Sequence, residues 1–129
     1  MKRSTFLLIT ACVLFAFGSS MFLSRTFAAD FLGLDATLQI NSVLKAMGGL
    51  LIGNSVLNYL LSKPQNPEVV HTLLLTNIVT HTLGFIAASM GVAEGTFTWV
   101  IIAPVIVVQL FIVIGSGVYL LGLKNQSRL

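Results

Sequence analysis

The chain has 129 residues, of which 56% are hydrophobic and 9% are charged, with seven Lys and Arg against four Asp and Glu. So few ionisable groups cannot cover the surface of a water-soluble domain, and the composition therefore excludes a soluble protein. The basic residues lie mostly singly at the ends of apolar runs, which is typical of membrane topology signals and argues against a nucleic-acid-binding surface.

Four apolar stretches predict four transmembrane helices, at about 5–24, 36–62, 67–92 and 97–123. Each is near or above the roughly 20 residues that a helix needs to cross the hydrocarbon of a bilayer. An irregular segment cannot satisfy its backbone N–H and C=O groups there, so each stretch must be helical. Because the later connections are short, neighbouring helices must be antiparallel. The sequence therefore predicts an all-α, antiparallel four-transmembrane-helix bundle that forms a single membrane domain over 1–129.

The first stretch also admits a second interpretation. Lys2 and Arg3 precede an apolar run, and Thr26-Phe27-Ala28-Ala29 follows it before Asp30, which together imitate a secretory signal peptide. Against cleavage, the apolar run extends to Leu23, and Arg25 stands where a cleavage region is usually uncharged. Cleavage would leave three helices and an external N-terminus, and this alternative stays open.

The connections carry residues that start helices. Asp35 is expected to cap the helix that begins near residue 36. In the next connection, Asn66 is expected to cap the third helix, with Pro67 at the first helical position and Glu68 in the first turn. Residues 91–96 are expected to form the turn before the fourth helix. These features support four helices independently of hydropathy.

The distribution of basic residues predicts the orientation. With a cytoplasmic N-terminus, the cytoplasmic side holds five of the seven bases, and the opposite loops hold one base with three of the four acids. The five are Lys2, Arg3, Lys63, Lys124 and Arg128; the opposite loops hold Arg25, Asp30, Asp35 and Glu94. By the positive-inside rule, both termini are then cytoplasmic, and we expect a bacterial inner membrane.

Lys45 is the most unusual polar residue within a predicted span. It lies ten residues after Asp35 and hence roughly 10 to 15 Å along the second helix. In one interpretation its long side chain snorkels to the outer surface and pairs with Asp30, Asp35 or Glu94. In the other, it is a functional cation that receives an anionic headgroup, a quinone oxygen or a substrate.

Asn77 and His81 are four residues apart on the third predicted helix and share one face. With Lys45 they are the best candidates for a ligand-binding pocket between the second and third helices. The alternative is a hydrogen-bond network between helices, and Gln109 in the fourth helix also needs a partner of that kind.

Catalytic and metal-binding patterns such as HExxH, CxxC and GxSxG do not occur in the sequence. His71 and His81 lie about 15 Å apart along one helix, so they cannot both ligate one haem. The sequence thus predicts no catalytic residue and no metal site, requires no cofactor, and leaves open whether one is bound.

Small residues predict helix contacts. Gly48 shares a face with Lys45, Gly49 and Gly53 form a small-xxx-small pair beside it, and Gly84 continues the face of Asn77 and His81. Glycine has no Cβ, so it lets two membrane helices approach closely. These four glycines are the predicted helix-packing positions.

Residues 44–54, with a basic residue before a Gly-Gly pair and a further glycine, resemble the second-helix signature of small membrane proteins of the DoxX-like and DUF4345-like groups. The resemblance implies a compact antiparallel four-helix bundle and a family whose biochemistry is mostly undefined. In those groups the basic position is expected to be Arg, whereas this chain has Lys45.

Two functions remain from these features. The first is a non-enzymatic accessory or assembly subunit that lies in the lipid bilayer as a homo-oligomer or within a larger membrane complex. The alternative is a binder or carrier of a small amphiphile, such as a quinone, a lipid or a pigment.

Overall fold

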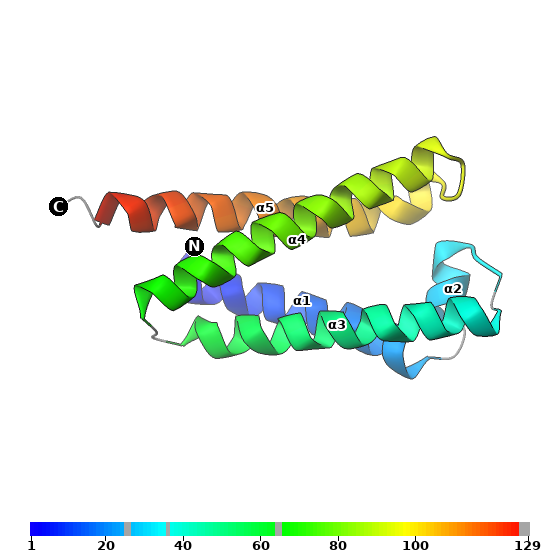
Figure 1. The fold of residues 1–129 in the computed structure, drawn as a ribbon, viewed down its shortest axis with the longest axis horizontal. Helices are drawn as coiled ribbons and strands as arrows, with labels where there is room; N and C mark the ends of the chain where they lie inside the picture. The colour runs from blue at the N-terminus through cyan, green and yellow to red at the C-terminus, as the bar shows by residue number, and fades with distance from the viewer. Residues whose placement is uncertain (25–26, 36, 64–65, 127–129) are drawn as a thin grey trace. The chain divides into compact units, whose positions relative to one another are not determined.

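A computed structural model describes residues 1–24, 27–35, 37–63 and 66–126, so Arg25 and Arg128 lie outside the described residues. All regular secondary structure in this part of the chain is helical. Its elements are α1 (Arg3–Leu23), α2 (Phe27–Leu32), α3 (Leu38–Ser62), α4 (Pro67–Ala93) and α5 (Trp99–Gln126) (Figure 1). Four of them, α1, α3, α4 and α5, are long and apolar enough to cross a membrane, which confirms the prediction of an all-helical chain with four long apolar helices.

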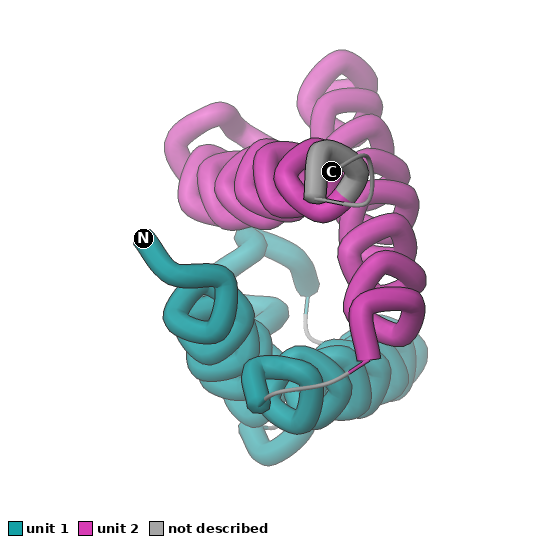
Figure 2. The backbone as a smooth tube through the Cα atoms, turned by 90° about the vertical axis from the view of Figure 1, so that its left-hand side faces the viewer, with its two compact units in different colours: residues 1–63 teal, residues 64–129 magenta. Residues whose placement is uncertain are grey.

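The chain divides into two compact units, Met1–Lys63 and Pro64–Leu129, which we call unit 1 and unit 2 (Figure 2). Unit 1 holds α1, α2 and α3, and unit 2 holds α4 and α5. Each unit is described by itself below.

Local chemistry explains where α3 and α4 begin. Asn66 caps α4, since its side-chain Oδ1 accepts a hydrogen bond from the backbone N–H of Glu68 at 3.0 Å, and Pro67 is the first helical residue, as predicted. The predicted cap of α3 is wrong. Thr37 takes that role by accepting the N–H of Ile40 at 3.2 Å, because the helix starts only at Leu38.

The two tight connections use glycine in a left-handed conformation. Gly33 follows α2 with φ 67°, and Gly95 follows α4 with φ 77°. After α4, the backbone N–H groups of Thr96 and Phe97 both donate to the carbonyl of Gly91, at 2.8 and 3.1 Å. The turn is therefore closed by its own hydrogen bonds, and α5 starts close to the end of α4.

Unit 1 is held together by small residues between α1 and α3. A Cβ added to Gly18 would stand 2.8 Å from the carbonyl oxygen of Gly48, and one added to Gly48 would stand 2.7 Å from that of Gly18. Two turns away, the Ser55 hydroxyl donates to the carbonyl of Ala11 at 2.8 Å. The residue numbers of both pairs add up to 66, so α1 and α3 pass each other in opposite directions.

In unit 2, α4 and α5 run side by side as a hairpin (Figure 1). Its glycines accommodate side chains: the amide of Gln109 lies against Gly84, and the ring of Phe97 lies against Gly91, where a Cβ would stand 2.6 Å from the ring carbon Cδ2. The α5 residues Ile102, Ile112 and Ser116 are also buried. Gly84 therefore makes room for a side chain of α5, and Gly91 makes room for a side chain of the connection that precedes α5.

Candidate functional site

The buried polar residues of α4 lie on one helix face. Asn77 is fully buried and His81 is 5% exposed, and helical spacing continues their face through Gly84 and Ala88 to Gly91. Burial of such groups is costly unless they are hydrogen-bonded. The buried polar side chains of α4 therefore lie together on this one face.

On α5, two oxygen atoms complete this polar region. The Oε1 atom of Gln109 and the hydroxyl oxygen of Ser116 are both buried and have no hydrogen-bond partner within the described ranges. Ser116 is fully buried, whereas the Gln109 side chain is only partly covered. Each oxygen can accept a hydrogen bond from a water molecule, a ligand or another chain.

The contact between Gly84 and Gln109 shows which residues of α4 and α5 lie side by side. Gly84 and Gln109 are in contact, and Asn77 and Ser116 each lie seven residues further toward the same end. Seven residues are about two helical turns, or roughly 10 Å, so Asn77 and Ser116 lie at about the same height. We call Asn77, His81, Gln109 and Ser116 the polar stripe of unit 2.

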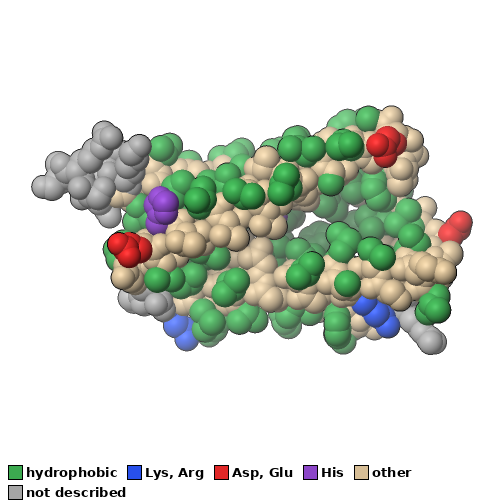
Figure 3. Space-filling view, viewed as in Figure 1, with side chains coloured by type: hydrophobic (Ala, Val, Ile, Leu, Met, Phe, Trp, Pro, Cys, Tyr) green, Lys and Arg blue, Asp and Glu red, His purple; other side chains and the backbone are tan. Residues whose placement is uncertain are grey.

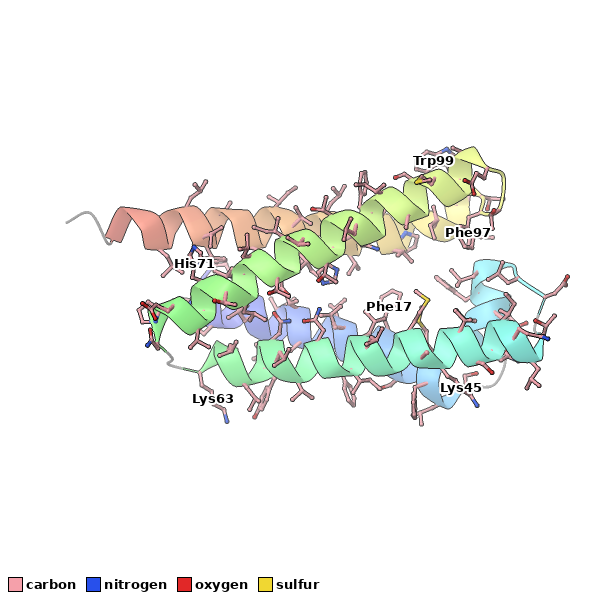
Figure 4. All side chains as sticks on the ribbon, viewed as in Figure 1. Phe17, Lys45, Lys63, His71, Phe97 and Trp99 are labelled. Atoms are coloured by element: carbon pink, nitrogen blue, oxygen red, sulfur yellow. The ribbon has the colours of Figure 1, made fainter. Side chains whose placement is uncertain are left out.

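Ser116 does not stand out as a site residue in the sequence, because it lies between two glycines and is as small as a packing residue. Its spacing of seven from Gln109 is the feature that could have identified it, because residues seven apart share a helix face. His71, the other histidine of α4, is exposed near the beginning of the helix (Figure 4).

Lys45 belongs to unit 1 and is exposed on α3. Its side chain and that of Lys63 project from the same side of the helix (Figure 4). In the described part of unit 1, Lys45 forms no ion pair with Asp30 or Asp35. Since Asn77 and His81 belong to unit 2, the pocket that would combine them with Lys45 stays a prediction.

The predicted packing glycines of α3 differ in their surroundings. Gly48 lies against the α1 backbone, whereas a Cβ on Gly49 would only touch the Phe22 ring at 3.9 Å. A Cβ on Gly53 would meet no described atom within 4 Å. Of these three glycines, only Gly48 therefore packs against the α1 backbone, and Gly53 leaves open space in the described structure.

Unit 1 also contains a cavity of about 230 Å³ between α1 and α2. It is lined by Ala16, Phe17, Ser20, Met21, Ala28 and Phe31. Its one polar side chain, Ser20, donates its hydroxyl to the carbonyl of Phe17 at 2.8 Å, so the lining offers almost no polar group. The cavity cannot be recognised in the sequence, because it depends on α2 folding against α1.

Within the described ranges, no three His, Cys, Asp or Glu side chains stand close enough together to hold a metal ion. No protein-family model, curated protein or solved structure matches this chain. The polar stripe must therefore be interpreted from its own geometry, and the resemblance to the DoxX-like and DUF4345-like groups stays a prediction.

Proposed function

We propose that this chain is an integral membrane protein whose four long helices cross a bilayer as an antiparallel bundle. In this proposal it is a non-enzymatic accessory or assembly subunit that packs against copies of itself or against other membrane proteins. The observation that carries the proposal is the exposed apolar surface of the long helices. Leu50 on α3 is 75% exposed and Val100 on α5 is 85% exposed, and Figure 3 shows hydrophobic side chains over much of the visible surface.

Open glycine positions support the assembly role. Within the described residues, Gly53 on α3 and Gly117 and Gly122 on α5 have no atom within 4 Å of the place that a Cβ would take. In membranes, such positions let a further helix approach closely, since association there depends on packing and not on hydrophobic burial. Gly53 is the position we expect to contact a partner.

The size of the particle in mild detergent or nanodiscs tests this role. We expect an oligomer of defined mass, and we expect Gly53→Leu to lower the oligomer fraction by blocking close approach. The matched control is Leu57→Ile one turn along α3, which preserves volume and should leave the oligomer intact. A strictly monomeric chain, or an oligomer indifferent to Gly53→Leu, would contradict the assignment of Gly53 to a partner contact.

The proposed location is a bacterial inner membrane, with both termini in the cytoplasm. Support comes from the excess of Lys and Arg at the chain ends and near Lys63, and from Trp99, which begins α5 and is 62% exposed, as interfacial aromatics are. Reporter fusions after Lys63, after Glu94 and at the C-terminus are expected to be cytoplasmic, external and cytoplasmic. An external C-terminal reporter would overturn this topology.

A second candidate function is favoured by the polar stripe of unit 2. Because the Ser116 hydroxyl oxygen and Gln109 Oε1 are buried without a partner in the described residues, they can receive the polar end of a quinone, a lipid or a pigment. The test is an absorbance spectrum and organic extraction of the purified protein, with Ser116→Ala and His81→Leu expected to lose the ligand. A colourless, ligand-free preparation whose stability is unchanged by both substitutions would remove this candidate.

A further inference from the structure

Lys45 on α3 and Lys63, the C-cap residue that directly follows α3, lie on one side of this helix. Eighteen residues separate Lys45 from Lys63, which is five full turns and about 27 Å of helix. Both side chains are exposed and project from the same side (Figure 4). The Lys63 ammonium also lies 5.1 Å from the centre of the Tyr59 ring, and tyrosine is an aromatic residue enriched at membrane interfaces.

The packing of α1 against α3 sets the height of these lysines. Counting from the contacts Gly18–Gly48 and Ala11–Ser55, Lys63 lies level with Arg3, and Lys45 lies level with Met21. These are nearly the two ends of α1, which runs from Arg3 to Leu23. Lys45 and Lys63 therefore lie level with the two ends of α1.

The part of α3 before Lys45, residues 38–44, is about 10 Å long, and by the same count its first five residues, 38–42, extend beyond Leu23, the last residue of α1. These five residues include the polar residues Gln39, Asn41 and Ser42. Next to this segment in unit 1 is α2, whose six residues are too short to cross a membrane. Where α1 ends, backbone N–H and C=O groups lose their helical partners, and such groups avoid the hydrocarbon.

We propose that Lys45 and Lys63 lie in the two headgroup layers of the bilayer, where their ammonium groups contact lipid phosphates, so that only 46–62 of α3 faces hydrocarbon. The separation of about 27 Å is close to the roughly 30 Å hydrocarbon thickness, and lysine stems extend the reach at both ends. Residues 38–44 and α2 then lie in the headgroup layer on the Lys45 side. This inference rests on the proposed membrane insertion.

A depth profile along α3 tests the inference. Nitroxide labels would be attached to single cysteines in a Cys12→Ala background, in vesicles of phosphatidylethanolamine and phosphatidylglycerol. The labelled positions are exposed residues along the helix: Val43, Met47, Leu50, Leu57 and Leu60. Depth is read from the relative accessibility to oxygen and to a water-soluble nickel chelate.

The expected profile is deepest near residue 54, midway between the lysines, with labels at Met47 and Leu60 at nearly equal depth. If the whole of α3 were centred in the bilayer, the deepest point would be near residue 50. The label at Met47 would then lie about 10 Å deeper than that at Leu60, which would overturn the inference while leaving membrane insertion intact. Equal aqueous exposure of all five labels would instead overturn the membrane proposal itself.

The role of the charge is tested separately. Lys45→Met is expected to move the deepest point from about residue 54 toward residue 50. Without the ammonium group, residue 45 no longer contacts the lipid phosphates and can enter the hydrocarbon. Gln39→Met is the matched control, because Gln39 is also an exposed polar residue of α3. This substitution should leave the depth profile unchanged. A profile that Lys45→Met does not move would show that the ammonium group does not set the position of α3.

Discussion

Units 1 and 2 both use glycine to bring two helices together, but the glycines make room for different things. In unit 1, Gly18 and Gly48 bring the backbone of α1 against the backbone of α3. In unit 2, Gly84 makes room for the amide end of Gln109 on α5. The contact in unit 1 is therefore between two rigid backbones, whereas the contact in unit 2 is with the end of a flexible side chain.

This difference determines how each unit can respond to an added methyl group. Two helix backbones can make room only by moving whole helices apart, which also disturbs the neighbouring contact between Ser55 and Ala11. The Gln109 side chain, in contrast, can rotate about several bonds. Close packing is therefore less tolerant of change in unit 1 than in unit 2.

The largest effect is expected for Gly48→Ala. A Cβ there would stand 2.7 Å from the Gly18 carbonyl oxygen and 2.9 Å from the backbone nitrogen of Phe22. We expect a loss of about 2 to 3 kcal/mol in the free energy of unfolding, the upper part of the range for overpacked sites. SDS titration of the purified protein in mild detergent, followed by circular dichroism, measures it.

The control for this substitution is Gly49→Ala on the same helix, where the nearest described atom to the added Cβ would be a Phe22 ring carbon at 3.9 Å, an ordinary van der Waals contact. It should change the free energy of unfolding by no more than about 0.5 kcal/mol. If Gly48→Ala proves as mild as Gly49→Ala, the close approach of α1 and α3 is wrong.

A smaller effect, about 1 kcal/mol, is expected for Gly84→Ala, because the Gln109 amide can turn aside. The double variant Gly84→Ala with Gln109→Ala should recover most of this loss, since the amide that clashes with the methyl group is gone. A double-mutant cycle on the free energy of unfolding measures the coupling. Additive losses would place Gln109 away from Gly84.

The smallest effect is expected for Ser55→Ala, which removes the hydrogen bond from the hydroxyl to the Ala11 carbonyl but keeps the close packing. Hydrogen bonds between membrane helices contribute about 0.6 kcal/mol on average, and we expect a loss of that size. The same SDS titration applies, with Ser42→Ala as the control, because that hydroxyl bonds only to Leu38 within its own helix. A loss no greater than that of Ser42→Ala would count against a stabilising contact at Ser55.

Local features of the sequence were enough to predict the four long helices. Each apolar stretch approaches or exceeds the length that crosses a bilayer, and backbone hydrogen bonding then leaves only the helix. The start of α4 was predicted for the same kind of reason, because Asn66 bonds to a backbone group two residues away. The start of α3 was not, since Thr37 lies close to Asp35 and either side chain can cap a helix.

The sequence by itself also identified Asn77, His81 and Lys45 as unusual, because polar groups within apolar stretches stand out without any knowledge of packing. Only the tertiary structure decided what lies beside them. In the tertiary structure, Gln109 lies against Gly84 and the Ser116 hydroxyl is buried. Gly48, and not Gly53, contacts α1. Lys45 lies level with Met21, near the end of α1. The reason is that the sequence defines the faces of a helix, whereas the register between two helices depends on how distant side chains fit together.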